Sequence, residues 1–330
     1  GGYAGEGAGY PGAFGYLTPD LQDAVYIAPN MSFDFSLIQF QNLTPQEAAA
    51  IWAEEFADIV NYADTPIIAF PWHDYGPTEW MFEGQNSLYS YEMYDNFLAI
   101  AHAAGTEFVT GQDLAERIAA FEDSELTLSR SGDTITAMVV AGEVAGRFAL
   151  DLGEQISSVA GWYAWDGTQI FLPQGGGQFD VTVGAGAADV TRLTALADRS
   201  ELISVTGDGR NLIAQIDGSG DFSINLGPDW GSDNVIIRGV DSVTNWTGNG
   251  LDLVLSDGLN ALVVEYVEGN TPGTRSREVM IGGVDDDTLF GGGGADVMIG
   301  GAGADDFVFG PNSAGSIVLD FDQEGDELVL

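Results

Sequence analysis

The chain has 330 residues with 51 acidic and 9 basic side chains, which gives a net charge of −42 at neutral pH. All nine bases are arginines, and the lack of lysine and cysteine excludes Schiff-base catalysis, thiol catalysis, iron–sulfur clusters and cysteine-type zinc sites. Nucleic-acid binding is not expected, because this charge repels phosphates. No membrane span is expected either, because no apolar run approaches the length of about 18 residues that a crossing helix needs.

Hydrophobic residues make up 45% of the chain, which is enough to build real cores despite the charge. The length predicts two or three domains at about 150 residues each. We divide the sequence into residues 1–123, 124–270 and 271–330. No signal peptide is recognisable and residue 1 is glycine, so we expect a processed product or part of a longer chain.

Residues 1–123 alternate strand and helix signals, which predicts α/β units with a parallel sheet. Thr44 and Glu47 form a capping box that opens an amphipathic helix. Gly105 ends a second helix, and Thr110 caps a third. The predicted strands are 24–28, 65–70 and 107–109, and the predicted later helices are 91–104 and 110–121.

Residues 124–270 lose the helical signals and show many short apolar runs separated by Gly, Asp and Asn turns, which favours one or two β-sandwiches. Aromatic residues gather at 161–167, where Trp162, Tyr163 and Trp165 lie. Tryptophans of a sandwich belong more often to the core, but an exposed turn here would offer faces for sugar rings. The predicted strands are 125–128, 134–140, 147–150, 202–205, 212–216, 222–226, 235–237, 251–255 and 261–266.

Residues 271–330 are repetitive. Residues 291–299 read Gly-Gly-Gly-Gly-Ala-Asp-Val-Met-Ile, and residues 300–308 read Gly-Gly-Ala-Gly-Ala-Asp-Asp-Phe-Val. Both fit the nonapeptide Gly-Gly-x-Gly-x-Asp-x-U-x, in which U is a large apolar residue. Residues 282–290 fit except at the third glycine position. Residues 273–281 keep the leading glycine and carry a glutamate at the acid position, so we interpret them as a degenerate first repeat.

This period predicts a coil of two nonapeptides, in which turns on one edge belong to alternate repeats. Asp287 then faces Asp305, and Asp296 lies opposite Glu278. Each turn holds glycines that can adopt positive φ, and each following strand points one apolar side chain inward. The predicted inward residues are Leu289, Met298 and Phe307.

Stacked acidic turns of this kind predict calcium sites, because Ca²⁺ takes 6–8 oxygens from carboxylates and backbone carbonyls. A flexible Gly/Asp-rich linker is the alternative, but it does not explain apolar residues that keep register with the glycines. Without the ion we expect this segment to be largely unfolded. The predicted site residues in the repeats are Gly283, Asp285, Asp287, Gly292, Gly294, Asp296, Gly301, Gly303 and Asp305.

With these repeats, residues 273–330 resemble the C-terminal repeat region of the RTX, or hemolysin-type calcium-binding, proteins. Segments 317–322 and 325–330 are similar to the cap that follows such repeats, and this similarity implies Asp320 and Asp326 as further calcium ligands. The resemblance also implies export by type I secretion machinery and folding outside the cell. We therefore expect a secreted, extracellular protein with a C-terminal parallel β-roll.

Residues 65–118 resemble the closing part of NodB-like polysaccharide deacetylases. The match rests on the strand at 66–70, the segment Pro71-Trp-His-Asp-Tyr-Gly76 and the later segment 104–110. The resemblance implies that His73 is a general acid that protonates the leaving amine. The early metal-binding motif of that family is missing, so any divalent catalytic metal would be held by residues outside this chain.

Together these patterns predict a multidomain protein with a partial α/β, deacetylase-barrel-like region, an all-β sandwich region and a β-roll. The favoured hypothesis is the C-terminal portion of a secreted, calcium-dependent protein that deacetylates a polysaccharide. The alternative is a non-catalytic extracellular protein that binds glycan or mediates adhesion. The residues upstream of residue 1 would discriminate between the two hypotheses.

Overall fold

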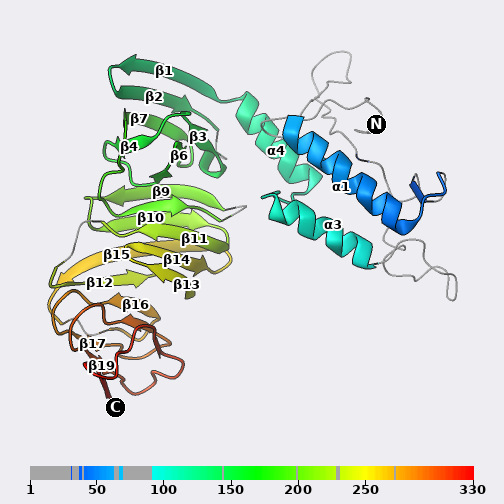
Figure 1. Ribbon diagram of the computed structural model, residues 1–330. Coiled ribbons are helices and arrows are strands. Elements are labelled where there is room, and N and C mark those ends of the chain that lie inside the picture. The colour runs from blue at the N-terminus through cyan, green and yellow to red at the C-terminus, as the bar shows by residue number, and fades with distance from the viewer. Residues whose placement is uncertain are drawn as a thin grey trace. The chain divides into compact units, whose positions relative to one another are not determined.

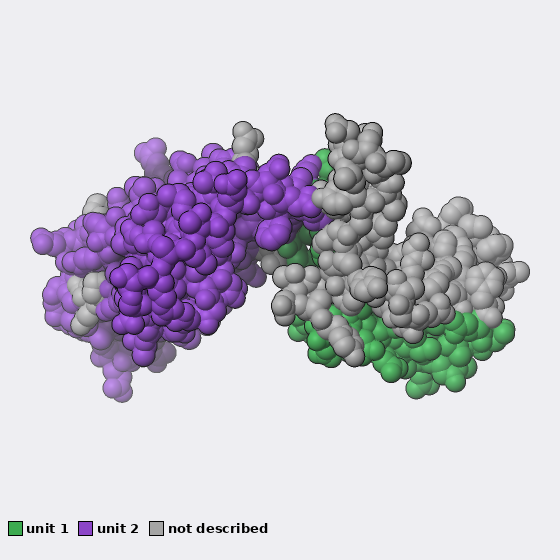
Figure 2. Space-filling view, turned by 90° about the horizontal axis from the view of Figure 1, so that it is seen from above, with its two compact units in different colours: residues 1–115 green, residues 116–330 purple. Residues whose placement is uncertain are grey.

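The computed structural model describes residues 31, 37–38, 41–62, 67–69, 91–142, 145–197, 200–227, 231–270 and 273–330. The chain forms two compact units, residues 1–115 and residues 116–330, which Figure 2 colours separately. Most of the regular structure is β. None of the described helices has both the length and the apolar character that a membrane crossing requires.

The described part of the first unit is helical. Helix α1, Pro45–Tyr62, begins at the predicted capping box: the Glu47 N–H donates to Thr44 Oγ1 at 3.3 Å, and the Thr44 N–H donates to Glu47 Oε2 at 2.9 Å. Helix α3, Tyr91–Ala103, packs on α1 through an edge-to-face pair of Phe56 and Phe97 with ring centroids 5.9 Å apart. Gly105, at φ +76°, ends α3 as predicted.

Helix α4, Gly111–Glu122, is also capped as predicted, since the Asp113 N–H donates to Thr110 Oγ1 at 3.1 Å. The predicted strand 107–109 is not formed, because residues 106–110 have neither helix nor strand structure and pair with none of the strands in the described part of the chain. Predicted strand 24–28, most of 65–70 and His73 lie outside the described residues. The parallel α/β arrangement of residues 1–123 therefore stays a prediction.

The second unit begins with a β-sandwich. One sheet has the order β1-β2-β7-β4 and the other has the order β3-β6-β5, and side chains from both sheets form one core. Its strands are β1 Glu125–Ser131, β2 Thr134–Val140, β3 Ala149–Asp151, β4 Ile156–Val159, β5 Trp165–Asp166, β6 Gln169–Phe171 and β7 Gly176–Val183, with a 3-10 turn at Ala145–Arg147. The core residues of β2 and β7 alternate with exposed ones, as strands with one wet face require.

A second sandwich follows. Its smaller sheet has the order β13-β14-β11-β8, and its larger sheet has the order β20-β18-β16-β12-β15-β10-β9. The strands of its sandwich part are β8 Arg192–Ala195, β9 Glu201–Gly207, β10 Leu212–Asp217, β11 Gly220–Asn225, β12 Asp233–Arg238, β13 Ser242–Thr247, β14 Gly250–Leu255 and β15 Leu259–Glu268. The apolar runs predicted most of these strands, whereas β8 and β13 were not predicted.

The last part of the chain is the predicted parallel β-roll (Figure 1, orange to red). Its strands are β16 Glu278–Ile281, β17 Thr288–Phe290, β18 Val297–Ile299, β19 Asp306–Val308, β20 Ile317–Val318 and β21 Glu327–Val329. Met280 pairs with Met298, and Leu289 pairs with Phe307, so one coil takes two nonapeptides. These four side chains form the core of the roll.

The roll is continuous with the second sandwich. Strand β16 pairs with the sandwich strand β12 in antiparallel fashion and with β18 in parallel fashion. Val279, Ile281, Val297 and Ile299 point away from the roll and belong to the core of the second sandwich. Each such side chain contributes roughly 1.5–3 kcal/mol when buried. The predicted division at residue 271 thus falls between two strands, β15 and β16, of one sheet.

Candidate metal centre

The turns of the roll form two stacks, one on each edge. We call the stack of turns 282–287, 300–305 and 320–326 the Asp305 edge. We call the stack of turns 273–278, 291–296 and 310–316 the Asp296 edge. Every turn except the first connects two short strands of the roll, so the pairing of the strands fixes the position of these turns in their stack.

Acids lie directly above one another on the Asp305 edge. The Asp287 N–H donates to Asp305 Oδ1 at 2.8 Å, and the Asp305 N–H donates to Asp326 Oδ1 at 3.0 Å. Asp320 accepts the Gly300 and Gly301 N–H groups, one on each carboxylate oxygen, both at 2.8 Å. Asp287 thus stacks on Asp305, as the two-nonapeptide coil predicts, and Asp326 and Asp320, which the resemblance implies as ligands, contact the turn 300–305.

Glycine is required where these turns stack. Gly301 and Gly303 have φ of +89° and +140°, and a Cβ on them would lie 2.5 Å from the Gly283 oxygen and 2.4 Å from the Asp285 oxygen. Gly292 and Gly294 repeat this arrangement on the Asp296 edge, with φ of +75° and +117°. The glycines therefore let each turn approach the carbonyl groups of its neighbour closely.

The stacked carboxylates are buried without enough positive charge. Asp287 and Asp305 are only 6% and 1% exposed. Burial raises the pKa of both carboxyls, and the carboxylates around each of them raise it further, against the opposing effect of a backbone N–H donor. For Asp305, the neighbouring acids are Asp326, Asp287 and Asp320. A bound cation would relieve this repulsion.

Asp296 and Glu278 are the two most deeply buried acids of the repeats, and both side chains are 0% exposed. The two carboxyls differ in their partners. For Asp296, the partner of only one oxygen is found. Its Oδ1 accepts the Glu278 N–H at 3.0 Å, whereas its Oδ2 is buried with no hydrogen-bond partner. Burial raises the pKa of Asp296, and Glu278 adds to the rise while Arg277 and hydrogen bonding oppose it. A buried carboxylate oxygen without a donor is costly, so this atom calls for a ligand.

Glu278 differs from the other acids, because protein groups satisfy it. Its Oε2 accepts the Thr274 N–H at 3.0 Å, and its Oε1 accepts the Thr274 hydroxyl. Arg238 of β12 places its Nε 3.7 Å from Glu278 Oε1 and also pairs with Glu265. The sequence reasoning missed Arg238, since it lies outside the repeats and no spacing links it to them.

Two predicted site residues also contact the second sandwich. Gly283 lacks the positive φ of its counterparts, and a Cβ on it would lie 2.1 Å from the Gly231 oxygen in the loop before β12. Asp285 accepts the Ser232 hydroxyl at 2.5 Å and has no positive φ either. Asp285 occupies the position of the third glycine in the motif, and it hydrogen-bonds this turn to the sandwich.

The residues present fit calcium. The orphaned Asp296 oxygen, the buried acids of the Asp305 edge and the turn carbonyls are the hard oxygen donors that Ca²⁺ prefers. Across the described residues, no three His, Cys, Asp or Glu side chains converge into a ready-made metal cluster. Backbone carbonyls would therefore have to complete each coordination sphere. Ligation by the individual predicted residues stays a prediction.

The aromatic cluster at 161–167 is packed into the sandwiches and forms no exposed platform. Trp165 is 1% exposed, and the Arg192 guanidinium lies 4.3 Å from its ring centroid. Trp162 is half-buried, and its indole N–H donates to the Ala164 and Phe171 oxygens at 3.0 and 3.1 Å. The favoured interpretation of these tryptophans as core residues is confirmed, and the alternative of an exposed sugar-stacking turn finds no support in their burial.

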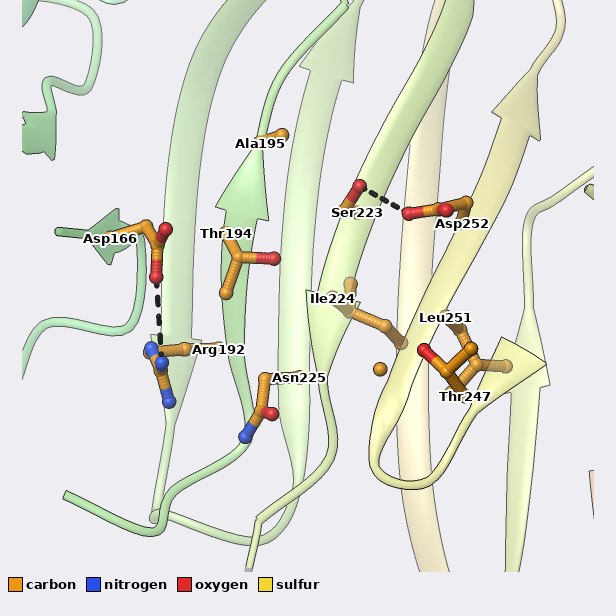
Figure 3. A pocket seen from close by; sticks show the side chains of 11 residues that line it. Asp166, Arg192, Thr194, Ala195, Ser223, Ile224, Asn225, Thr247, Leu251 and Asp252 are labelled. Carbon is orange, nitrogen blue, oxygen red and sulfur yellow. Dashed lines mark hydrogen bonds and ion pairs between the residues drawn. The ribbon is translucent and has the colours of Figure 1, made fainter. Parts of the chain in front are cut away.

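A polar pocket of about 380 Å³ lies over the smaller sheet of the second sandwich (Figure 3). Ser223 donates to Asp252 Oδ1 at 2.6 Å, and with Asn245 as a second donor this holds the pKa of Asp252 below its usual range. Arg192 stands on one side, 3.6 Å from Asp166, and its Nε has no hydrogen-bond partner. The other polar residues around the pocket are Thr194, Asn225 and Thr247.

The sequence model of the RTX calcium-binding nonapeptide repeat (4 copies) matches residues 272–307. The chain therefore carries RTX repeats, a class that binds Ca²⁺. No curated protein and no solved structure matches the chain. The match covers the repeats alone, and the resemblance of residues 65–118 to deacetylases has no support from these comparisons.

Proposed function

We propose that this is a secreted, extracellular protein whose roll binds calcium in its stacked turns and completes its fold as it does so. The main support for the proposal is the stack of buried carboxylates, in which one oxygen of Asp296 has no hydrogen-bond partner. A divalent cation neutralises such a stack and supplies the missing partner. Export by type I secretion machinery, with folding delayed until the chain meets external calcium, follows from the RTX repeats as part of this proposal.

A calcium titration of the whole chain tests the proposal, with magnesium as the control ion. Calcium at 100 times its dissociation constant should stabilise the fold by about 2.7 kcal/mol, which thermal unfolding detects. Magnesium should have little effect, because it demands near-ideal octahedral geometry and gives up its water reluctantly. An unchanged melting temperature in calcium would refute calcium-coupled folding.

A second candidate function is glycan binding by the polar pocket over the smaller sheet. Hydroxyl, amide, carboxylate and guanidinium groups line one concave surface, and this mixture suits a ligand with many hydroxyl groups. Titration with neutral glucan and uronate oligosaccharides tests the idea. Asp252→Ala should weaken binding about tenfold, or 1.4 kcal/mol, whereas Asp257→Ala on an exposed turn should not. Failure of both sugar classes to bind would end this proposal.

For residues 1–123, the deacetylase resemblance supports a further proposal for the full-length protein, metal-assisted deacetylation of a polysaccharide. His73 would act as the general acid, and the divalent metal would be held by residues not present in this chain. A longer chain that includes the upstream residues should release acetate from an acetylated polysaccharide, and His73→Ala should reduce that rate by roughly 10²–10⁴-fold. Equal rates in both proteins would rule out this role for His73.

A further inference from the structure

Glu278 and Asp296 occupy the same position in successive turns of one edge, yet their surroundings are opposite. Both side chains are fully buried. Every carboxylate oxygen of Glu278 has a donor from Thr274, and a cation from Arg238 stands beside it. Asp296 keeps one oxygen with no partner at all. Only Asp296 therefore has a carboxylate oxygen that a metal ion could satisfy.

We propose that the first turn of the roll, residues 273–278, binds no calcium, because Arg238 already supplies a positive charge beside Glu278. The turn then belongs to the sandwich, and calcium loading begins with the turns that follow it. This inference rests on the proposed calcium binding and specifies where that binding starts. The first repeat then has a structural role, because the pairing of β16 with β18 sets the register of the turns that bind calcium.

The contacts of β16 support a turn that folds with the sandwich. Its Val279 and Ile281 side chains belong to the sandwich core, and its backbone pairs with β12 over four residues. The next turn is held to the same sandwich, because the Val284 N–H donates to the Gly231 oxygen at 2.9 Å. None of these contacts needs an ion, so the first strand of the roll has its partners before calcium arrives.

Charge supports the same division. The side chain of Arg238 is about one-third exposed and sits between Glu265 and the buried Glu278. A buried carboxylate is tolerated when a cation and hydrogen-bond donors face it. A calcium ion placed beside Glu278 would meet the positive charge of Arg238 and would have to displace the Thr274 donors. The structure therefore opposes a metal ion at this turn.

The test compares two isosteric variants of the full chain, Glu278→Gln and Asp296→Asn. Bound calcium is counted by equilibrium dialysis with metal analysis. We expect Glu278→Gln to keep the wild-type number of ions and a midpoint within about twofold of it, a shift of only about 0.4 kcal/mol. We expect Asp296→Asn to lose one ion. Loss of an ion from Glu278→Gln, or an unchanged count in Asp296→Asn, would overturn the inference.

Arg238→Met provides a second test that does not depend on the first variant folding. The variant leaves the buried Glu278 without its cation, so the melting temperature should fall in chelator, and saturating calcium should recover part of the loss by adding one bound ion to the wild-type number. An unchanged melting temperature in chelator, or a loss that calcium leaves untouched with no added ion, would show that Arg238 does not keep calcium out of this turn and would overturn the inference. A wild-type chain that binds no calcium would instead refute the proposed function, so the two failures are distinguishable.

Discussion

The two edges of the roll share one sequence motif but balance their charge differently. On the Asp305 edge, each acid stacks on another acid, and Asp287, Asp305 and Asp326 follow one another through backbone N–H donors. On the Asp296 edge, Arg238 stands by the first acid, and Ser316 accepts the Asp296 N–H at 3.0 Å at the far end. The repeat motif therefore predicts the position of each turn. The residues around the turn determine how much of its negative charge is left for a cation to neutralise.

Calcium removal should give the largest effect and should divide the roll unevenly. In chelator, amide protons of strands β17 to β21 should lose protection, because their turns depend on the ion. Protection in β16 should persist, because that strand belongs to the sandwich sheet. Hydrogen exchange followed by mass spectrometry measures both regions in one experiment. Equal loss of protection in β16 and β19 would contradict the idea that the first turn of the roll folds without calcium.

Gly303→Ala should come next in size. The new Cβ would meet the Asp285 oxygen at 2.4 Å in a backbone with φ +140°, so the Asp305 edge must shift. We expect a loss of about 3 kcal/mol in calcium, measured by denaturant unfolding. Gly132→Ala is the matched control, because it has φ +62° and open space around the added carbon. A similar loss in both variants would mean that backbone strain alone, and not turn stacking, explains the result.

The effect of Asp305→Asn on the stability of the roll should be opposite with and without calcium. Without the ion it should favour the folded roll, because it removes repulsion with Asp326, Asp287 and Asp320. With the ion it should weaken calcium binding about tenfold, or 1.4 kcal/mol. Slower amide exchange of β19 in chelator measures the first effect, and a calcium titration measures the second.

Ser316→Ala is the comparison on the other edge. It removes one uncharged acceptor of the Asp296 N–H and should cost about 1 kcal/mol in saturating calcium, where the turns are folded, while the midpoint of calcium binding stays within about twofold. A tenfold change of the midpoint in Ser316→Ala, or an unchanged midpoint in Asp305→Asn, would contradict the assigned roles.

Acidification should have the smallest effect. The folded, calcium-free protein has a raised pKa at Asp287, Asp296 and Asp305, so it binds protons more tightly than the unfolded chain. The free energy of unfolding should therefore rise as the pH falls from neutrality toward the ordinary value of 3.8, and the gain disappears as the pH rises through the raised values. We expect about 1 kcal/mol, or roughly 2–4 °C. The gain should be smaller in Asp305→Asn, and an equal gain in both proteins would assign it to other groups.

The sequence predicted the coil and its acid stacks because one motif fixes both. The stacking of Asp287 on Asp305 follows from an 18-residue coil, and so does the pairing of Leu289 with Phe307. The fusion to the sandwich was missed, although a signal was present. Residues 279–281 and 297–299 both read Val-Met-Ile, and three consecutive apolar residues are typical of a strand buried on both faces.

Other features could not be predicted from the repeats at all. Asp285 looked like a site residue with one motif position changed, yet its partner Ser232 lies 53 positions earlier in the chain. Arg238 is likewise distant in sequence from Glu278. Contacts of this kind depend on how sheets pack, and no local spacing encodes them. The polar pocket around Arg192 also assembles from separate strands, since Asp166 comes from the first sandwich and the other lining residues from the second.

The continuous sheet has a consequence for self-association. In the complete fold the edge on the roll side of this sheet is β20, a strand of two residues that offers little length for pairing with another chain. If the calcium-dependent coils unwind, the edge moves back to β16, whose four residues are buried in the complete fold. A bare apolar edge strand is a template for another copy of the chain. If calcium binds as proposed, it should therefore also limit aggregation, and light scattering in chelator would reveal the loss of solubility.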